Sequence, residues 1–324
     1  MKKFFLLLPC LVVFGLLISY FIPSVRKKEI FVSNTYKNVL ASATNPGNWI
    51  SWDPSVRQAW LKDSSACTFT EDTIRHITTI DIPGKKITVT QLSYLAYQLE
   101  ETKSNHSSFF VLTVIPFVGN DQLRSRHNAT IGFAEDSRWL YKIFPFLDKG
   151  SFAQTTISNL ADYLNNTTRF YGFSIEVKQT TADTMFLTRK ETLPKKDLFQ
   201  KIPILFDTLE HYAQQVHVQA GHKNIYYNFL PHDSIEILAG LNIDKRIEGD
   251  YLHSFMEMPT GQALAVARFE GPFRDRLKAY EAMEKYIPDH ELIKLGVCFE
   301  KYLSPLPQSD SSVIQIELSY PLRF

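Results

Sequence analysis

The chain has 324 residues, of which 44% are hydrophobic and 21% are charged, and its formal net charge is +1. This length suits about two folded domains, and the composition excludes a disordered chain, which would carry fewer apolar residues and a larger net charge. The near-neutral charge provides no basic footprint for nucleic acid, so we expect no nucleic-acid partner.

The first segment is an apolar leader with basic flanks. Two lysines precede an uncharged run over residues 4–22, and Arg26, Lys27 and Lys28 follow it. A helix of this length spans about 28 Å, close to the hydrocarbon thickness of a bilayer. We therefore expect residues 1–28 to form an N-terminal membrane anchor, with a cleaved signal peptide as the alternative. Because positive charge flanks both ends, the orientation rule leans only slightly towards a cytoplasmic bulk of the chain.

Residues 29–170 alternate between strand and helix patterns. A short strand is expected at residues 29–33, followed by a short helix that starts at Tyr36. Apolar residues at three- to four-residue spacing predict a closing helix over residues 151–169. Period-two alternation predicts further strands at residues 73–80, 86–92, 109–116 and 128–134.

This order of elements resembles the START-like or SRPBCC helix-grip domain. The motif Asn45-Pro46-x-x-Trp49-x-x-Trp52-Asp53-Pro54 stands in the expected place after the first strand. The resemblance implies a long helix across a curved sheet, with an apolar cavity between them for a hydrophobic ligand. Trp49 and Trp52 are candidate ligand-binding residues of that cavity, and the alternative is that they plug one end of the core.

Residues 172–324 carry one pattern twice. The first copy has a strand at residues 184–190, an amphipathic helix at 197–218 that Pro203 either opens or kinks, and two further strands. The second copy has a strand at residues 262–269, a helix from Phe273 and two more strands. Two strand–helix–strand–strand units in tandem predict a pseudo-symmetric, duplicated β-α-β-β domain, so the whole chain is expected to be of the α+β class.

Several ordered motifs of this half look like the GyrI-like domain, which is also the effector-binding module of some bacterial multidrug-sensing transcription regulators. They are Met258-Pro259-x-Gly261, Glu270-Gly271-Pro272-Phe273, Gly296-x-x-x-Glu300-x-Tyr302 and Glu317-x-x-Tyr320-Pro321. The family usually has a tyrosine where this chain has Phe273, and the change removes a hydroxyl group.

Glu300 and Tyr302 are the main candidate site residues, because alternation places them on one face of a strand. The resemblance implies that Glu300 lies in a ligand pocket, and the alternative is a solvated glutamate beside Lys301. Tyr226 and Tyr227 fall in the corresponding strand of the first copy, and only one of them can face the groove.

We therefore expect a membrane-anchored binding protein for hydrophobic or cationic amphipathic small molecules, with the ligand near Glu300 and Phe273. One alternative is a hydrolase of electrophilic small molecules in which Glu300 activates water and Tyr302 positions the substrate. Another is a ligand-sensing module that acts through a protein partner. The chain has no HExxH or phosphate-binding glycine motif, so neither a metal nor a cofactor is expected.

Overall fold

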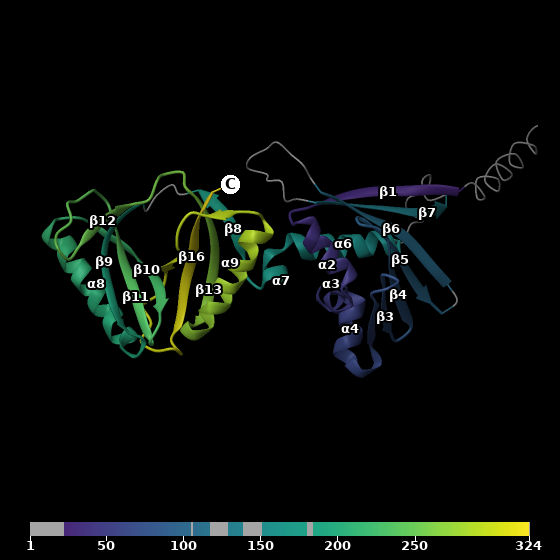
Figure 1. The fold of residues 1–324 in the computed structure, drawn as a ribbon, viewed down its shortest axis with the longest axis horizontal. Helices are drawn as coiled ribbons and strands as arrows, with labels where there is room; N and C mark the ends of the chain where they lie inside the picture. The colour runs from purple at the N-terminus through teal and green to yellow at the C-terminus, as the bar shows by residue number, and fades with distance from the viewer. Residues whose placement is uncertain (1–22, 105, 117–128, 139–150, 180–183, 324) are drawn as a thin grey trace, which may run out of the picture. The chain divides into compact units, whose positions relative to one another are not determined.

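The computed structural model describes residues 23–104, 106–116, 129–138, 151–179 and 184–323 (Figure 1). The chain divides into two compact units, Met1–Asn166 and Thr167–Phe324. Each unit combines helices with one antiparallel sheet, so the predicted α+β class is confirmed.

The described strands of the first unit form a seven-stranded antiparallel sheet with the order β1-β7-β6-β5-β4-β3-β2. β1 therefore pairs with β7, the last described strand of the unit. Each of the strands from β3 to β6 pairs with the strands that precede and follow it in the sequence. The bounds are β1 Pro23–Val32, β2 Thr68–Asp72, β3 Ile77–Ile82, β4 Lys85–Ser93, β5 Ala96–Lys103, β6 His106–Pro116 and β7 Ala129–Arg138.

Helices of the first unit begin at side chains that cap their free N–H groups. Thr35, Asp53 and Ser151 each accept a backbone hydrogen bond at the start of α2, α4 and α6, respectively. The long helix α6 buries residues such as Ile157 and Leu160 and contacts β1, β6 and β7. The bounds are α2 Tyr36–Thr44, α3 Trp49–Trp52, α4 Pro54–Lys62 and α6 Phe152–Asn165, with short 3₁₀ turns η1 Pro46–Asn48 and η2 Ser64–Ala66.

The strand predicted at residues 73–80 begins only at Ile77, because residues 73–76 form a tight turn. The Asp72 side chain accepts hydrogen bonds from the backbone N–H groups of Ile74 and Arg75. His76 then adopts a left-handed backbone conformation with φ of 52°. This local side-chain turn outcompetes the β-branched pattern, ends β2 at Asp72 and delays the start of β3 to Ile77.

The described strands of the second unit form a nine-stranded antiparallel sheet, ordered β12-β9-β11-β10-β15-β16-β13-β8, with β14 beside β16. The strands are β8 Ile175–Gln179, β9 Met185–Pro194, β10 Ala220–Leu230, β11 Ser234–Ile243, β12 Ser254–Glu257, β13 Ala263–Pro272, β14 Ile293–Lys294, β15 Phe299–Tyr302 and β16 Val313–Arg323. The helical elements are α7 Thr167–Tyr171, η4 Lys195–Asp197, α8 Leu198–Gln215, η5 Phe273–Arg276 and α9 Leu277–Asp289.

The repeat read from the sequence is visible in the strand order. The first copy comprises β9, α8, β10 and β11, and the second comprises β13, α9, β15 and β16. In both copies the last strand lies between the other two, so the sheet reads β9-β11-β10 and then β15-β16-β13. The copies meet at a seam between β10 and β15, where Asn224 pairs with Lys301 and Ile225 with Glu300.

Helices α8 and α9 cover this sheet with a single core. Buried residues of α8 such as Leu205 belong to the same apolar cluster as Met283 of α9 and Ile237 and Ile316 of the sheet. Pro203 lies inside α8, although it cannot donate the hydrogen bond that normally links it to the preceding turn.

The localisation expected from the sequence, a single-pass anchor with a cytoplasmic bulk, needs correction. Within the residue ranges that the structure describes, no helix has both the length and the apolar character needed to cross a membrane. The predicted spanning segment 4–22 lies outside those ranges. Arg26, Lys27 and Lys28, expected at a membrane interface, instead belong to β1, because their backbone pairs with β7 and Arg26 forms an ion pair with Glu135 at 3.5 Å.

We expect Ile225→Ala to destabilise the second unit by about 2–4 kcal/mol, because Ile225 is fully buried at the seam and the change leaves a cavity there. Chemical denaturation of the full chain measures the effect. The control is Ile204→Ala on α8, where the side chain is 55% exposed and the free energy of unfolding should change by less than about 1 kcal/mol. Equal losses in both variants would contradict the importance of the seam.

Candidate functional site

The seam between the two copies places a carboxylate in the core of the second unit. Alternation along β15 directs Glu300 and Tyr302 to the helix-covered face, where both are buried, while Phe299 and Lys301 are only partly buried. Glu300 has no exposed surface. The alternative of a solvated strand glutamate is therefore wrong.

Three side chains satisfy the Glu300 carboxylate. Its Oε1 atom accepts hydrogen bonds from Arg276 Nε and from the Tyr280 hydroxyl, each at 2.8 Å. Its Oε2 atom accepts from the Tyr302 hydroxyl at 2.8 Å. The Tyr227 and Tyr302 hydroxyl oxygens are 3.0 Å apart. Because the Tyr302 proton is already donated to Glu300, Tyr227 is the donor in that pair.

Arg276 brings a buried positive charge to the same place. Its side chain is 5% exposed, and its Nη1 atom donates to the Phe273 carbonyl at 3.1 Å. The guanidinium carbon lies 3.5 Å from the centre of the Phe273 ring and 5.1 Å from that of Tyr227. Cation–π attraction of this kind strengthens when water is excluded. The ion pair is thus enclosed by aromatic rings.

Burial sets the protonation of the surrounding groups. It raises the pKa of Tyr280 well above the ordinary value, and the Glu300 charge adds to the effect. Burial likewise raises the pKa of Tyr302 and of Tyr227. For Arg276, burial alone lowers the pKa, but the Glu300 carboxylate raises it, and the net shift is upward. The phenols remain neutral donors and the guanidinium remains charged.

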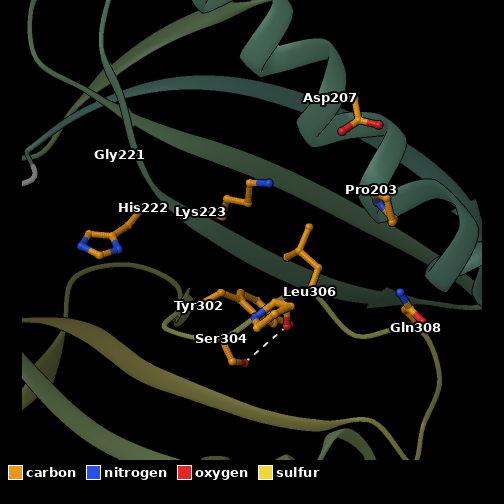
Figure 2. Close-up of a pocket in the computed structure, with 10 residues that line it drawn as sticks. Pro203, Asp207, Gly221, His222, Lys223, Tyr302, Ser304, Leu306 and Gln308 are labelled. Atoms are coloured by element: carbon orange, nitrogen blue, oxygen red, sulfur yellow. Dashed lines mark hydrogen bonds between the residues drawn. The ribbon is translucent and has the colours of Figure 1, made fainter.

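A cavity of about 460 Å³ borders this cluster at Tyr302 (Figure 2). Figure 2 shows Pro203 and Asp207 on α8 on one side, and Tyr302, Ser304 and Leu306 on the other. The complete lining is Pro203, Asp207, Gly221, His222, Lys223, Tyr302, Ser304, Pro305, Leu306 and Gln308. Tyr302 therefore contacts both the cavity and the buried carboxylate.

The remaining predicted site residues lie in three different places. Tyr227 and Phe273 join the Glu300 cluster. Tyr226 instead lines a small apolar pocket of about 90 Å³ on the sheet, with Phe186, Met256, Met258, Val297 and Phe299 among its neighbours. Trp49 and Trp52 are buried in the first unit, where their indole N–H groups donate to the carbonyls of Ala43 and Ser42.

Sequence reasoning missed Arg276 and Tyr280 as members of the site. A signal for them exists, because residues 273, 276, 280, 283 and 287 follow helical spacing on one face. A lone arginine within such an apolar stripe indicates a buried charge, which requires a buried partner.

We expect Glu300→Gln to cost about 3–5 kcal/mol of unfolding free energy, because it leaves the Arg276 charge buried without a counter-ion. The double variant Arg276→Met/Glu300→Gln should recover most of this loss. Glu317→Gln is the control, since its partners Arg268 and Lys178 are 69% and 40% exposed and these ion pairs should contribute less than about 1 kcal/mol each. Wild-type stability of Glu300→Gln would contradict the ion pair.

Stability should also fall at alkaline pH. Unfolded tyrosines ionise near pH 10, whereas the folded phenols of Tyr227, Tyr280 and Tyr302 have higher pKa values. The contribution of these neutral phenols to the free energy of unfolding is complete below about pH 10. It is lost as the pH rises through the pKa values of the folded state. Phenolate absorbance should therefore show a slow phase that coincides with unfolding. Tyr302→Phe should reduce the amplitude of that slow phase. Exposed tyrosines ionise in a fast phase without unfolding, so Tyr251→Phe should reduce only the fast phase, because Tyr251 is 99% exposed.

No protein-family model matches this sequence, and no curated protein matches it significantly. Solved structures show distant similarity. The EcmrR–DNA complex is 12% identical with a TM-score of 0.41, covering 56% of this chain and 68% of that one. A START superfamily protein from Mycobacterium smegmatis is 6% identical with a TM-score of 0.28, covering 43% and 96%. SAV2435 bound to tetraphenylphosphonium is 13% identical with a TM-score of 0.28, covering 46% and 94%. Similarities this distant assign no family to the chain.

Proposed function

We propose that the second unit binds a hydrophobic or amphipathic small molecule in the cavity beside Tyr302. The observation that carries the proposal is the position of Tyr302, which lines the cavity and donates to a fully buried carboxylate. A buried ion pair costs several kcal/mol of desolvation, and well-packed apolar residues of similar volume often give equal or greater stability. Retaining such a cluster next to a cavity is typical of functional sites.

The lining of the cavity favours a ligand with an apolar body and a polar group. Its volume of about 460 Å³ lies within the range of small-molecule sites. Pro203, Leu306 and the ring of Tyr302 provide apolar surface, while His222 and Lys223 provide hydrogen-bonding groups.

The charges around the cavity balance, because its lining carries one carboxylate, Asp207, and one ammonium group, Lys223, and the buried pair behind Tyr302 is neutral. In that pair the guanidinium of Arg276 neutralises Glu300 at 2.8 Å, so the ion pair presents no net charge to the cavity. An uncharged ligand therefore gains as much from Tyr302 as a charged one, and it loses less hydration on entering. We expect neutral ligands to be preferred.

A cationic ligand is the second candidate, because the groups around Arg276 form a receptor for a planar cation. Glu300 supplies the negative charge, and the rings of Phe273 and Tyr227 supply cation–π surfaces. In this structure Arg276 itself occupies that receptor. A cationic ligand must first displace the guanidinium, which lowers its apparent affinity.

The geometry does not favour a hydrolase that uses Glu300. A general base must reach the proton of a water molecule, but Glu300 is fully buried and already accepts three hydrogen bonds. Burial also raises the pKa of the neighbouring Cys298 well above its ordinary value, so that thiol is a poor nucleophile. A sensing role through a protein partner stays a prediction.

Isothermal titration of the full chain with two probes tests the proposal. Triphenylphosphine oxide is neutral and tetraphenylphosphonium is cationic, and both carry several phenyl rings. We expect the neutral probe to bind at least as tightly as the cation. Tighter binding of the cation by about tenfold or more, a difference of at least about 1.4 kcal/mol, would support the second candidate instead.

The location of the site is tested with a matched pair of leucines. Leu306→Trp fills the cavity and should weaken binding of the neutral probe by about tenfold or more. The control is Leu303→Trp in the same segment. The Leu303 side chain is 48% exposed and does not line the cavity, so this substitution should leave the affinity unchanged. Similar affinities in the two variants would exclude this cavity.

A further inference from the structure

The first unit contains a polar cavity that is independent of the site around Glu300. It has a volume of about 450 Å³ and is bordered by the start of α4, by β4 and β5, and by the first turns of α6. The resemblance to helix-grip domains implied an apolar cavity with Trp49 and Trp52. Those indoles are buried elsewhere in the core, and charged and hydroxyl groups line this cavity.

An ionic triad lies on the strand side of the cavity. The Lys85 ammonium is 2.8 Å from Glu101 Oε1, and the Lys103 ammonium is 3.0 Å from Glu101 Oε2. The side chains of Lys85 and Glu101 are only 11% and 7% exposed, whereas Lys103 is 58% exposed. Two positive charges thus share one buried carboxylate, and both of its oxygen atoms are occupied.

The ammonium groups keep donors that the triad does not use. Besides Glu101, Lys85 Nζ donates to Ser55 Oγ at 3.0 Å, and the Ser55 hydroxyl in turn donates to Asp53. An ammonium has three N–H donors. Among the described residues, one donor of Lys85 and two of Lys103 have no acceptor.

Asp53 also lines the cavity, but its charge is already engaged. Its Oδ1 atom accepts from the backbone N–H groups of Ser55 and Val56 at 2.9 and 3.0 Å, which caps α4. A carboxylate at that position stabilises the positive end of the helix. The triad of Lys85, Glu101 and Lys103 carries one net positive charge, which Asp53 balances over the whole lining, so the unused ammonium donors rather than an excess of charge are what the cavity offers to an anion.

The opposite wall of the cavity offers neutral hydrogen-bonding groups and one ring. Ser151, Thr155 and Asn159 belong to the N-terminal half of α6, whose dipole favours negative charge. Phe152 provides an apolar surface, and its ring centre is 5.4 Å from Lys85 Nζ.

We propose that this cavity binds a small organic anion through its carboxylate or phosphate group. The anionic oxygen atoms accept hydrogen bonds from Lys85 and Lys103, and the organic part lies against Phe152. Charge-assisted bonds to ammonium groups are about twice as strong as neutral ones, and they compensate for desolvation of the anion. Glu101 competes with the ligand for the same two lysines.

Titration of the full chain with inorganic phosphate, acetate and phenyl phosphate at constant ionic strength tests this site. We expect phenyl phosphate to bind more tightly than inorganic phosphate, because only the ester contacts Phe152. Lys103→Gln should weaken binding by about tenfold. The control is Lys86→Gln. Lys86 follows Lys85 in β4 but does not line the cavity, so its loss should change the affinity by less than about twofold.

Glu101→Gln separates a binding role from a structural one. Removing the competing carboxylate should strengthen phenyl phosphate binding, whereas a purely structural triad predicts only a lower melting temperature. The proposal is overturned by lack of saturable binding to the wild-type chain, or by equal losses in Lys103→Gln and Lys86→Gln. If Glu101→Gln does not fold, the lysine pair still decides the question, because Lys103 is exposed and its loss leaves the buried pair of Lys85 and Glu101 in place.

Discussion

The core of the second unit depends on the ion pair between Glu300 and Arg276, whose side chains are 0% and 5% exposed. A carboxylate without exposed surface is stable there only because a guanidinium and two phenols contact it directly. These groups come from separate elements: Glu300 and Tyr302 from β15, Arg276 from η5 and Tyr280 from α9. All of them belong to the second copy of the repeat, so that copy satisfies the charge by itself, and the first copy adds Tyr227 of β10, whose hydroxyl lies 3.0 Å from that of Tyr302.

The two units treat buried charge in different ways. In the second unit one carboxylate meets one guanidinium, the pair is neutral, and aromatic rings exclude water. In the first unit one carboxylate meets two ammonium groups, and the assembly faces a cavity lined by hydroxyl groups. A balanced pair suits a ligand without charge, whereas ammonium groups with unused donors suit an anion. On this basis we propose different ligand preferences for the two units.

Local sequence patterns predicted helices and strands well wherever the spacing of apolar side chains determines the backbone conformation. The closing helix of the first unit and the two strand–helix–strand–strand copies follow from apolar spacing, and the structure contains them. The pattern failed at residues 73–80, where the Asp72 side chain forms a turn within a β-branched segment. It also failed at Arg26, Lys27 and Lys28, because a basic cluster after an apolar run looks the same whether it flanks a membrane or lies in an edge strand such as β1.

The sequence by itself determined the α+β class, the internal repeat and the position of Glu300 and Tyr302 on one face of a strand, since each depends on residue types at short spacing. Only the tertiary structure decided that Tyr227 rather than Tyr226 faces the carboxylate, because strand pairing sets which face is covered by helices. It alone revealed Arg276 as the partner, since 24 positions separate it from Glu300. Contacts between distant positions arise from packing and register, which no local pattern encodes.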